Sequence, residues 1–490
     1  MSAEPLLIQG GMGIGVSGWR LARAISVMGQ LGVVSGTALD AVFVRRLQLG
    51  DPDGHLRRVL RKFPVPSVVD RILAKYFREG GKGEQETYRL GPMYTVGSSE
   101  IQQDLSVAAN FAEVALSKER HDGLVGLNLL EKVQMPTLAS LFGSILAGVD
   151  YVLMGAGIPR EIPGALDRMS AWESATLRVH VAGAGAEEGL TIRFDPSRFA
   201  GGGGHALKRP KFLAIVSSHV LAANLLKKST GRVDGFVVEG PTAGGHNAPP
   251  RGAMQLNTRG EPIYGERDEV DLEKMRALGT PFWLAGGYGS ADGLGRALKE
   301  GANGIQAGTA FAFCEESGFA PELKRDVLRL VWEGRTEVRT DPLASSSGYP
   351  FKVLKVPQTL SEIPVYEARE RVCDLGFLRE VYQTPAGGWG YRCPAEPVDV
   401  YLRKGGMRKD TEGRQCLCNS LMAAIGLAQR REGGNPEPAL ITAGDDITSV
   451  RRFLSDERRT YTAADVVRDI LRDHPGTFRD EEFPTGASPR

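Results

Sequence analysis

The chain has 490 residues, and its 60 Lys and Arg balance 59 Asp and Glu to a formal net charge of +1. This balance lacks the basic excess of a nucleic-acid binder, and no polybasic run indicates a membrane surface. No apolar stretch reaches the roughly 18 residues of a membrane-spanning helix. The N-terminus lacks the features of a signal peptide, and five Cys are too few for a disulfide scaffold. We therefore expect a soluble cytoplasmic protein without a nucleic-acid or membrane partner.

Short apolar runs alternate with amphipathic segments of helix length. The runs are rich in Val, Ile and Leu and do not alternate with polar residues, which is typical of strands buried on both faces of a parallel sheet. We predict eight strands, at Leu6–Gln9, Gly32–Ser35, Leu124–Asn128, Tyr151–Met154, Phe212–Ser217, Gly235–Glu239, Phe282–Ala285 and Gly304–Ala307. We predict helices between them at Thr137–Leu146, Val220–Lys228, Asp271–Leu278 and Ala291–Glu300. This α/β pattern favours a (β/α)8 barrel over an open doubly wound sheet.

Insertions interrupt the predicted barrel, which we place at residues 1–335. They lie at about residues 47–93, 177–210 and 247–270. The first is helical in character. The second has two β-like pieces followed by four glycines at Gly201–Gly204, which favours a hairpin with a mobile tip.

An appended region follows the barrel at residues 340–475. We predict helices there at Cys418–Leu427 and Ala463–Arg472, the second with Thr462 as its N-cap. Residues 476–490 are expected to form a frayed tail.

Glycine is unusually frequent, at 62 of 490 residues against an average of about 7%, and it gathers at strand ends. Because glycine has no side chain, the backbone at these positions can approach a ligand closely, so this pattern favours an enzyme. The glycine-rich stretches are Gln9–Gly13 after the first strand, Glu239–His246 after the sixth, Ala285–Gly289 after the seventh and Gln306–Thr309 after the eighth. The last two precede helices, whose N-termini attract anions. Two such loops on consecutive strands favour a phosphate site over simple tight turns.

Five motifs occur in order over about residues 5–320: QGGMG, VGLNLL, EGPTAGGH, LAGGYGSADGL and GANGIQAGTAF. Together they resemble the nitronate monooxygenase family, formerly called 2-nitropropane dioxygenases, and the related flavin-dependent enoyl-[acyl carrier protein] reductases. The resemblance implies a TIM barrel that binds FMN and acts as an oxidoreductase.

Cofactor-binding residues follow from the same resemblance. It implies that Gly10, Gly11 and Met12 lie against the flavin ring, that Asn128 lies near its pyrimidine edge, that Gly244 and Gly245 line the site, and that Gly286, Gly287, Gly308 and Thr309 hold the phosphate with Gln306 close by. Glu239 stands where family members often have Gln.

His246 is the candidate catalytic base. Two glycines place it just beyond the sixth strand, and an imidazole with an unperturbed pKa near 6.5 is suited to proton transfer. The resemblance implies that the equivalent His is the base of nitronate monooxygenases and lies near the substrate carbonyl in the reductases.

The polar stretch after His246 differs from a minimal nitronate monooxygenase. It resembles more closely the enoyl reductase components associated with polyunsaturated fatty acid synthases. Arg251 within it is either a contact for a carboxylate or phosphate of a larger substrate or a solvated loop charge.

The leading interpretation is an FMN-dependent oxidoreductase of the nitronate monooxygenase type, which oxidises a nitronate-like or other activated-carbon substrate. The alternative is an NAD(P)H-dependent enoyl-thioester reductase within a fatty acid or polyketide synthase system. A non-redox barrel for a phosphorylated metabolite and a synthase component docked through the C-terminal region also stay open. The expected partner is a small molecule or an acyl thioester, and a homodimer is compatible with the sequence.

Four of the five cysteines, Cys373, Cys393, Cys416 and Cys418, lie within 46 residues. Together they offer four sulfur ligands for Zn²⁺ or an iron–sulfur cluster. Their spacing matches no strong motif, however, and free Cys is often simply buried. A metal site is therefore one hypothesis for them and apolar packing the other. Cys314 is expected to be a buried helix residue.

Overall fold

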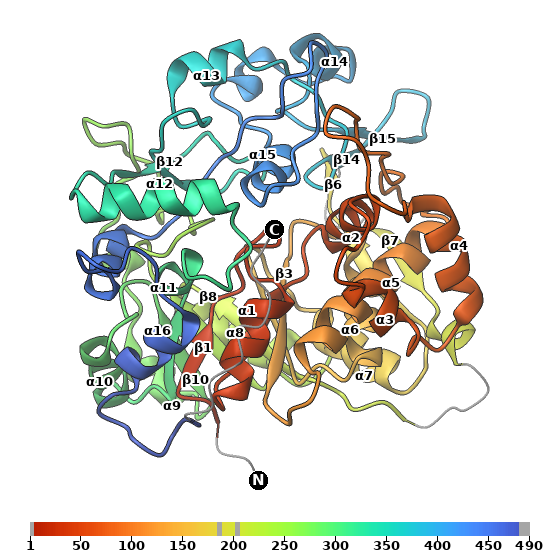
Figure 1. Ribbon diagram of the computed structural model, residues 1–490. Coiled ribbons are helices and arrows are strands. Elements are labelled where there is room, and N and C mark those ends of the chain that lie inside the picture. Colours follow the sequence, from red (N-terminus) through yellow and green to blue (C-terminus); the bar gives the residue numbers. More distant parts are fainter. Residues whose placement is uncertain (1–3, 184–188, 201–205, 480–490) are drawn as a thin grey trace.

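The computed structural model describes residues 4–183, 189–200 and 206–479. Its central feature is one sheet of eight parallel strands in the order β1-β11-β10-β9-β8-β4-β3-β2 (Figure 1). The strands are β1 (Leu7–Gln9), β2 (Gly32–Ser35), β3 (Val125–Leu130), β4 (Tyr151–Gly155), β8 (Lys211–Val216), β9 (Gly235–Glu239), β10 (Phe282–Ala285) and β11 (Gly304–Ala307). All eight predicted strands are confirmed, with ends that differ by at most two residues.

The sheet closes between its first and last strands. Ile8 pairs in parallel with Leu31, the residue before β2. The Gln9 N–H donates to the Leu31 carbonyl at 3.0 Å, and the Leu31 N–H donates to the Leu7 carbonyl at 3.1 Å. These bonds make the sheet a barrel, so the fold prediction is confirmed and the open-sheet alternative is wrong.

The barrel interior is filled by large apolar side chains, among them Leu153, Leu213, Val237 and Trp283. Trp283 is fully buried, and its indole N–H donates to the Pro5 carbonyl at 2.8 Å. The opposite faces of the strands pack against helices. Because both faces are buried, the strand sequences carry no polar alternation.

Helices cover the outside of the barrel (Figure 1). They are α1 (Trp19–Val27), α5 (Glu100–Ser117), α6 (Thr137–Leu146), α7 (Ile162–Ser170), α8 (His219–Lys228), α9 (Leu272–Ala277), α10 (Ala291–Lys299), α11 (Thr309–Ala312) and α12 (Pro321–Trp332). The four predicted helices are among them. Cys314 is fully buried, as expected, but it lies in the turn after α11 rather than in the helix.

The first predicted insertion is helical, with α3 (His55–Leu60) and α4 (Pro66–Tyr76) after α2 (Leu39–Gln48). The second contains a confirmed hairpin of β5 (Ala175–Val179) and β7 (Leu190–Phe194), followed by η1 (Pro196–Phe199). Its predicted tip, Gly201–Gly204, lies outside the described residues. The third insertion contains only the short helix η2 (Glu266–Asp268).

Beyond the barrel, short elements alternate with loops. They are β12 (Val338–Asp341), β13 (Phe351–Leu354), α13 (Ile363–Ala368), β14 (Glu380–Gln383), β15 (Trp389–Arg392), α14 (Val398–Arg403), η3 (Arg408–Thr411), α15 (Leu417–Ala424), η4 (Asp445–Phe453) and α16 (Ala463–Ile470). Both predicted helices are present, although α15 ends three residues early. Thr462 caps α16 as expected, because its Oγ1 accepts from the Asp465 N–H at 3.2 Å. The four strands among these elements were not predicted from the sequence.

The C-terminal region packs directly on the barrel. Helix α16 contacts α1, α10 and α11, and η4 contacts α11 and α12 (Figure 1). Arg479, which lies within the stretch predicted to fray, donates its N–H to the Met28 carbonyl at 3.0 Å. Among the described residues, no helix has the length and apolar character needed to cross a membrane.

Candidate active site

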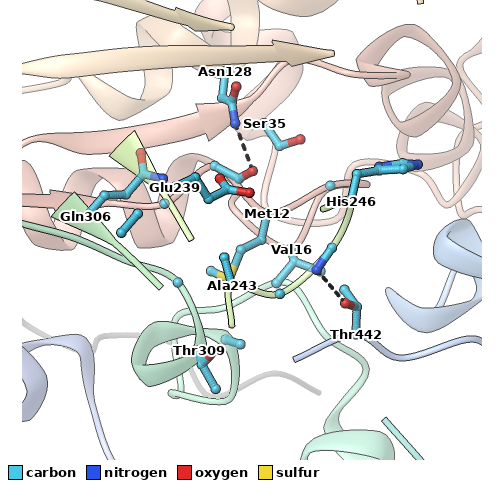
Figure 2. Close-up of a pocket in the computed structure, with 18 of the residues that line it drawn as sticks. Met12, Val16, Ser35, Asn128, Glu239, Ala243, His246, Gln306, Thr309 and Thr442 are labelled. Carbon is cyan, nitrogen blue, oxygen red and sulfur yellow. Dashed lines mark hydrogen bonds between the residues drawn. The ribbon is translucent and has the colours of Figure 1, made fainter. Parts of the chain in front are cut away.

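One cavity opens at the carboxyl edge of the barrel, where the strand-end loops meet (Figure 2). All residues predicted for cofactor binding and catalysis line it: Gly10, Gly11, Met12, Asn128, Glu239, Gly244, Gly245, His246, Gly286, Gly287, Gln306, Gly308 and Thr309. They come from the ends of β1, β3, β9, β10 and β11. The fold therefore brings together side chains and loops that lie up to about 300 positions apart in the sequence.

Close backbone approach explains two of the glycines. A Cβ atom on Gly11 would lie 2.3 Å from the Cβ of Asn128, whose Nδ2 donates to the Gly11 carbonyl at 3.1 Å. Gly286 has φ of +86°, and a Cβ there would lie 2.9 Å from Thr242 Oγ1. Any other residue at these positions would push the loops apart or strain the backbone. These two glycines therefore fix the shape of the cavity wall.

The polar atoms of the wall are compatible with a flavin. Asn128 Oδ1 and Gln306 Oε1 are buried without a hydrogen-bond donor among the described residues. Such acceptors gain a partner when a bound ring presents an N–H, as the pyrimidine part of a flavin does. The lining residues include no Lys or Arg. A phosphate here would therefore depend on backbone N–H groups and on the N-terminus of α10.

The C-terminal region completes the cavity through Thr442, Ala443 and Asp446. The Gly245 N–H donates to Thr442 Oγ1 at 2.8 Å, and the Gly444 N–H donates to Thr309 Oγ1 at 3.0 Å. The sequence analysis missed this segment. The sequence feature that could have indicated it is an apolar run that ends in Thr-Ala-Gly, because the predicted barrel strands also end in small residues and glycine.

Asp446 lies beside the predicted phosphate loops. A Cβ on Gly289 would lie 3.8 Å from its Oδ2, and its Oδ1 is buried without a donor among the described residues. Burial raises the pKa of this carboxyl group. A raised pKa lessens the repulsion that an ionised carboxylate would exert on a bound phosphate.

His246 lines the cavity but is turned toward the C-terminal region. Its Nε2 lies 2.7 Å from Ser345 Oγ, and its ring meets Phe351 edge-on at a centroid distance of 4.9 Å. In Figure 2 the imidazole points away from Glu239. Burial lowers the pKa of His246 to about 4, so the ring is neutral at pH 7. A neutral imidazole held by a hydroxyl group is able to accept a proton.

A second cavity meets the first at Ala156, Ile215, Glu239 and His246. Its outer walls are formed by the end of β8, by the insertion after His246 and by Tyr349. The predicted residue Arg251 lines this second cavity rather than the first. Its side chain is exposed, and its NH2 group donates to the Ser217 carbonyl at 3.0 Å. The insertion therefore shapes a space that opens onto His246.

Of the two hypotheses for Cys373, Cys393, Cys416 and Cys418, the structure favours apolar packing over a metal site. All four are described, and among the described residues no group of three or more His, Cys, Asp or Glu is arranged to hold a metal ion. Cys393, Cys416 and Cys418 pack within an apolar cluster. Burial raises the pKa of all four thiols, which keeps them protonated at neutral pH. The proximity of Cys393, Cys416 and Cys418 in the sequence accompanies a shared apolar core.

A closed barrel with a glycine-walled cavity at its carboxyl edge is typical of cofactor-binding barrel enzymes. Residues 206–360 match the model of the nitronate monooxygenase family. This match confirms the relationship predicted from the sequence and relates the chain to a family of oxidoreductases.

One curated relative is a "Probable nitronate monooxygenase" of Bacillus subtilis (strain 168), which is 38% identical over 122 residues. The alignment spans 25% of this chain and 33% of that protein, so it covers only a third of the relative.

Two solved structures are also similar to the chain. FabK from Thermotoga maritima is 16% identical, with a TM-score of 0.46 over 96% of this chain and 93% of that one. A nitroalkane oxidase from Streptomyces ansochromogenes is 15% identical, with a TM-score of 0.46 over 96% of both chains. The barrel assignment rests on the strand pairing described above.

Proposed function

We propose that the protein is an FMN-dependent oxidoreductase of the nitronate monooxygenase type. The observation that supports this most is the convergence of every predicted cofactor residue, from five separate strand ends, on one cavity. The unpartnered acceptors of Asn128 and Gln306 suit a flavin ring, and the loops at Gly286 and Gly308 suit its phosphate. The substrate would be a nitronate or another molecule with an activated carbon.

In this proposal, bound FMN supplies the electron-accepting chemistry. The protein's own groups bind and orient. Gly10 and Gly11 would leave room for the ring, and the thioether side chain of Met12 would lie beside it. For a substrate whose activated carbon still carries its acidic hydrogen, His246 would accept that proton at its imidazole, and the hydroxyl group of Ser345 would hold the ring in place. The apolar residues of the wall exclude water from the reacting carbon.

The first experiment is an absorbance spectrum of the purified protein and of the protein after addition of FMN. Flavin bands that remain after gel filtration support the proposal, and a protein that takes up no FMN contradicts it. Release of the cofactor by heat identifies it as FMN, and oxygen uptake with a nitronate then tests the activity.

A pair of glycine variants sharpens the binding test. Gly308→Val adds carbons to the predicted phosphate loop, where a Cβ meets only Met12 at 3.8 Å or more. We expect it to weaken FMN binding about tenfold or more, which corresponds to about 1.4 kcal/mol. Gly295→Ala is the matched control, because a Cβ there meets nothing within 4 Å and the residue lies outside the cavity.

The second cavity favours a second candidate function, an NAD(P)H-dependent enoyl-thioester reductase. Its walls include Ile158, Ile215, Leu221 and Pro249, which would accommodate an extended apolar chain with its reacting end near His246. NADPH or NADH oxidation in the presence of an enoyl thioester distinguishes this activity from oxygen uptake with a nitronate.

A further inference from the structure

Glu239 is the last residue of β9 and pairs in register with Ala285 of β10. It lines both cavities at the place where they meet. Its carboxyl group makes no hydrogen bond or ion pair with any side chain or backbone group in the described part of the chain. An acid in this position faces the ligand space with its full hydrogen-bonding capacity unused.

Charged groups around the two cavities do not neutralise Glu239. On the side of the first cavity the other ionisable residues are His246, Tyr288 and Asp446. On the side of the second they are Arg251, Tyr264, Asp268 and Tyr349. The guanidinium of Arg251 donates to the Ser217 carbonyl, and its backbone N–H donates to Asp268. Burial alone raises the pKa of Glu239 to about 8, with no opposing cation. The carboxyl group is therefore mostly protonated at neutral pH.

The neighbouring His246 is shifted in the opposite direction. Burial holds its ring in the neutral form at pH 7, and Ser345 occupies its Nε2. The site thus places an uncharged acid and an uncharged base next to one ligand space. When the environment shifts the pKa values of two titratable groups in opposite directions, one group is suited to donate a proton and the other to accept one.

We propose that Glu239 is the hydrogen-bond donor of the active site, and that its protonated carboxyl group binds a carbonyl or nitro oxygen of a ligand lying where the two cavities meet. The negative charge that develops on such an oxygen during reaction is stabilised by a preorganised donor in a dry site. A Gln at this position would donate a hydrogen bond through its amide NH2 group. A Glu can replace that donor only while its carboxyl group is protonated. The identity of the ligand rests on the proposed function, whereas the protonation of Glu239 does not.

The protonation state is tested without any cofactor, by infrared difference spectra of the protein between pH 6 and pH 10. The wild type is expected to show the carbonyl band of a protonated carboxyl group that disappears as the pH rises through about 8. Glu239→Gln should lack this band, and Asp446→Asn, which removes the other buried acid of the first cavity, should retain it. Identical difference spectra for the wild type and Glu239→Gln would overturn the proposal.

The donor role is tested in the FMN-loaded protein by titration with a nitronate and with an enoyl thioester, followed through the flavin spectrum. Glu239→Leu keeps similar bulk without a donor, and we expect it to bind the probe about tenfold more weakly. Glu239→Gln should bind as tightly as the wild type below pH 8, and above it only the wild type should weaken. Equal binding by all three proteins at all pH values would refute the donor role. A protein that takes up no FMN would instead refute the proposed function.

Discussion

The barrel and the C-terminal region are stabilised by different kinds of interaction. The barrel buries continuous apolar strands such as Phe236–Val238 on both faces. The C-terminal region has apolar clusters of its own, but it also buries an ion-pair network: Glu437, only 1% exposed, lies between Arg369 and Arg431 at 2.5 and 2.6 Å. Apolar burial tolerates many sequences, whereas a buried ion pair stabilises only when every partner is present. The difference predicts that the C-terminal region is the more sensitive of the two to single substitutions.

The largest effect is expected for Glu437→Gln. This change leaves two buried guanidinium groups without their shared carboxylate, and we expect a loss of about 3–5 kcal/mol in the free energy of unfolding. Urea denaturation measures it. Asp399→Ala is the control, because the Asp399–Arg403 ion pair has both side chains 68% exposed and should contribute less than about 1 kcal/mol. If both variants lose the same small amount, the buried network is not what holds this region together.

A comparable test inside the barrel is Leu213→Ala. Leu213 is 1% exposed and lies in the barrel interior, so its truncation should cost about 2–5 kcal/mol. Leu226→Ala on α8 removes the same atoms from a side chain that is 38% exposed and should change stability by about 0.5 kcal/mol or less. A single urea transition monitored by two probes would show that the barrel and the C-terminal region unfold together. Two transitions would separate them.

These two kinds of stabilisation explain how much the sequence could predict. Barrel strands such as Gly235–Glu239 and Phe282–Ala285 were located to the residue because an apolar run bounded by glycines is a local signal. Strands β14 and β15, with sequences EVYQ and WGYR, carry no such signal. Strand β14 owes its position partly to pairing with β6 (Val181–Ala182) of the distant hairpin. Tertiary contacts of this kind override local preference.

The candidate site divides in the same way. Its glycines were found because they follow strands, whereas Thr442 and Asp446 reach the cavity only through the packing of the C-terminal region on the barrel. The position of Glu239 was found from the sequence, but its protonation depends on burial among residues from several loops. The sequence left the clustered cysteines open between a metal site and apolar packing, and only the fold shows Cys393, Cys416 and Cys418 within an apolar cluster.

A pH dependence tests the burial of the carboxyl group of Asp40, which lies at the start of α2, before the first insertion. Asp40 on α2 is 7% exposed, and burial raises its pKa to about 6 from 3.8. The folded state therefore binds this proton more tightly than the unfolded state. The contribution of Asp40 to the free energy of unfolding is therefore greatest below about pH 4, and it is lost as the pH rises to about 6.

We expect Asp40→Asn to remove that loss. At pH 7 the variant should be more stable than the wild type by about 1–3 kcal/mol, and the difference should vanish near pH 4. Urea titrations at the two pH values measure it. A wild type and variant that differ by the same amount at both pH values would show that the carboxyl group does not titrate in this range.

The smallest effect is expected for Thr442→Val, which tests whether the C-terminal region contributes directly to the cavity. The substitution keeps the shape of the side chain but removes the acceptor of the Gly245 N–H, so that a partly buried donor beside the cavity loses its partner. An unsatisfied group of this kind costs about 1 kcal/mol, which corresponds to roughly a fivefold weaker affinity for FMN if the loop shifts in the free protein. Thr442→Ser keeps the hydroxyl group and should bind FMN as the wild type does.

If Thr442→Val lowers the stability but leaves FMN binding unchanged, the segment stabilises the fold behind the cavity without contributing to the cofactor site. If FMN binding weakens while the unfolding transition stays in place, the C-terminal region is part of the cofactor site itself, and the two regions share one function despite their different cores.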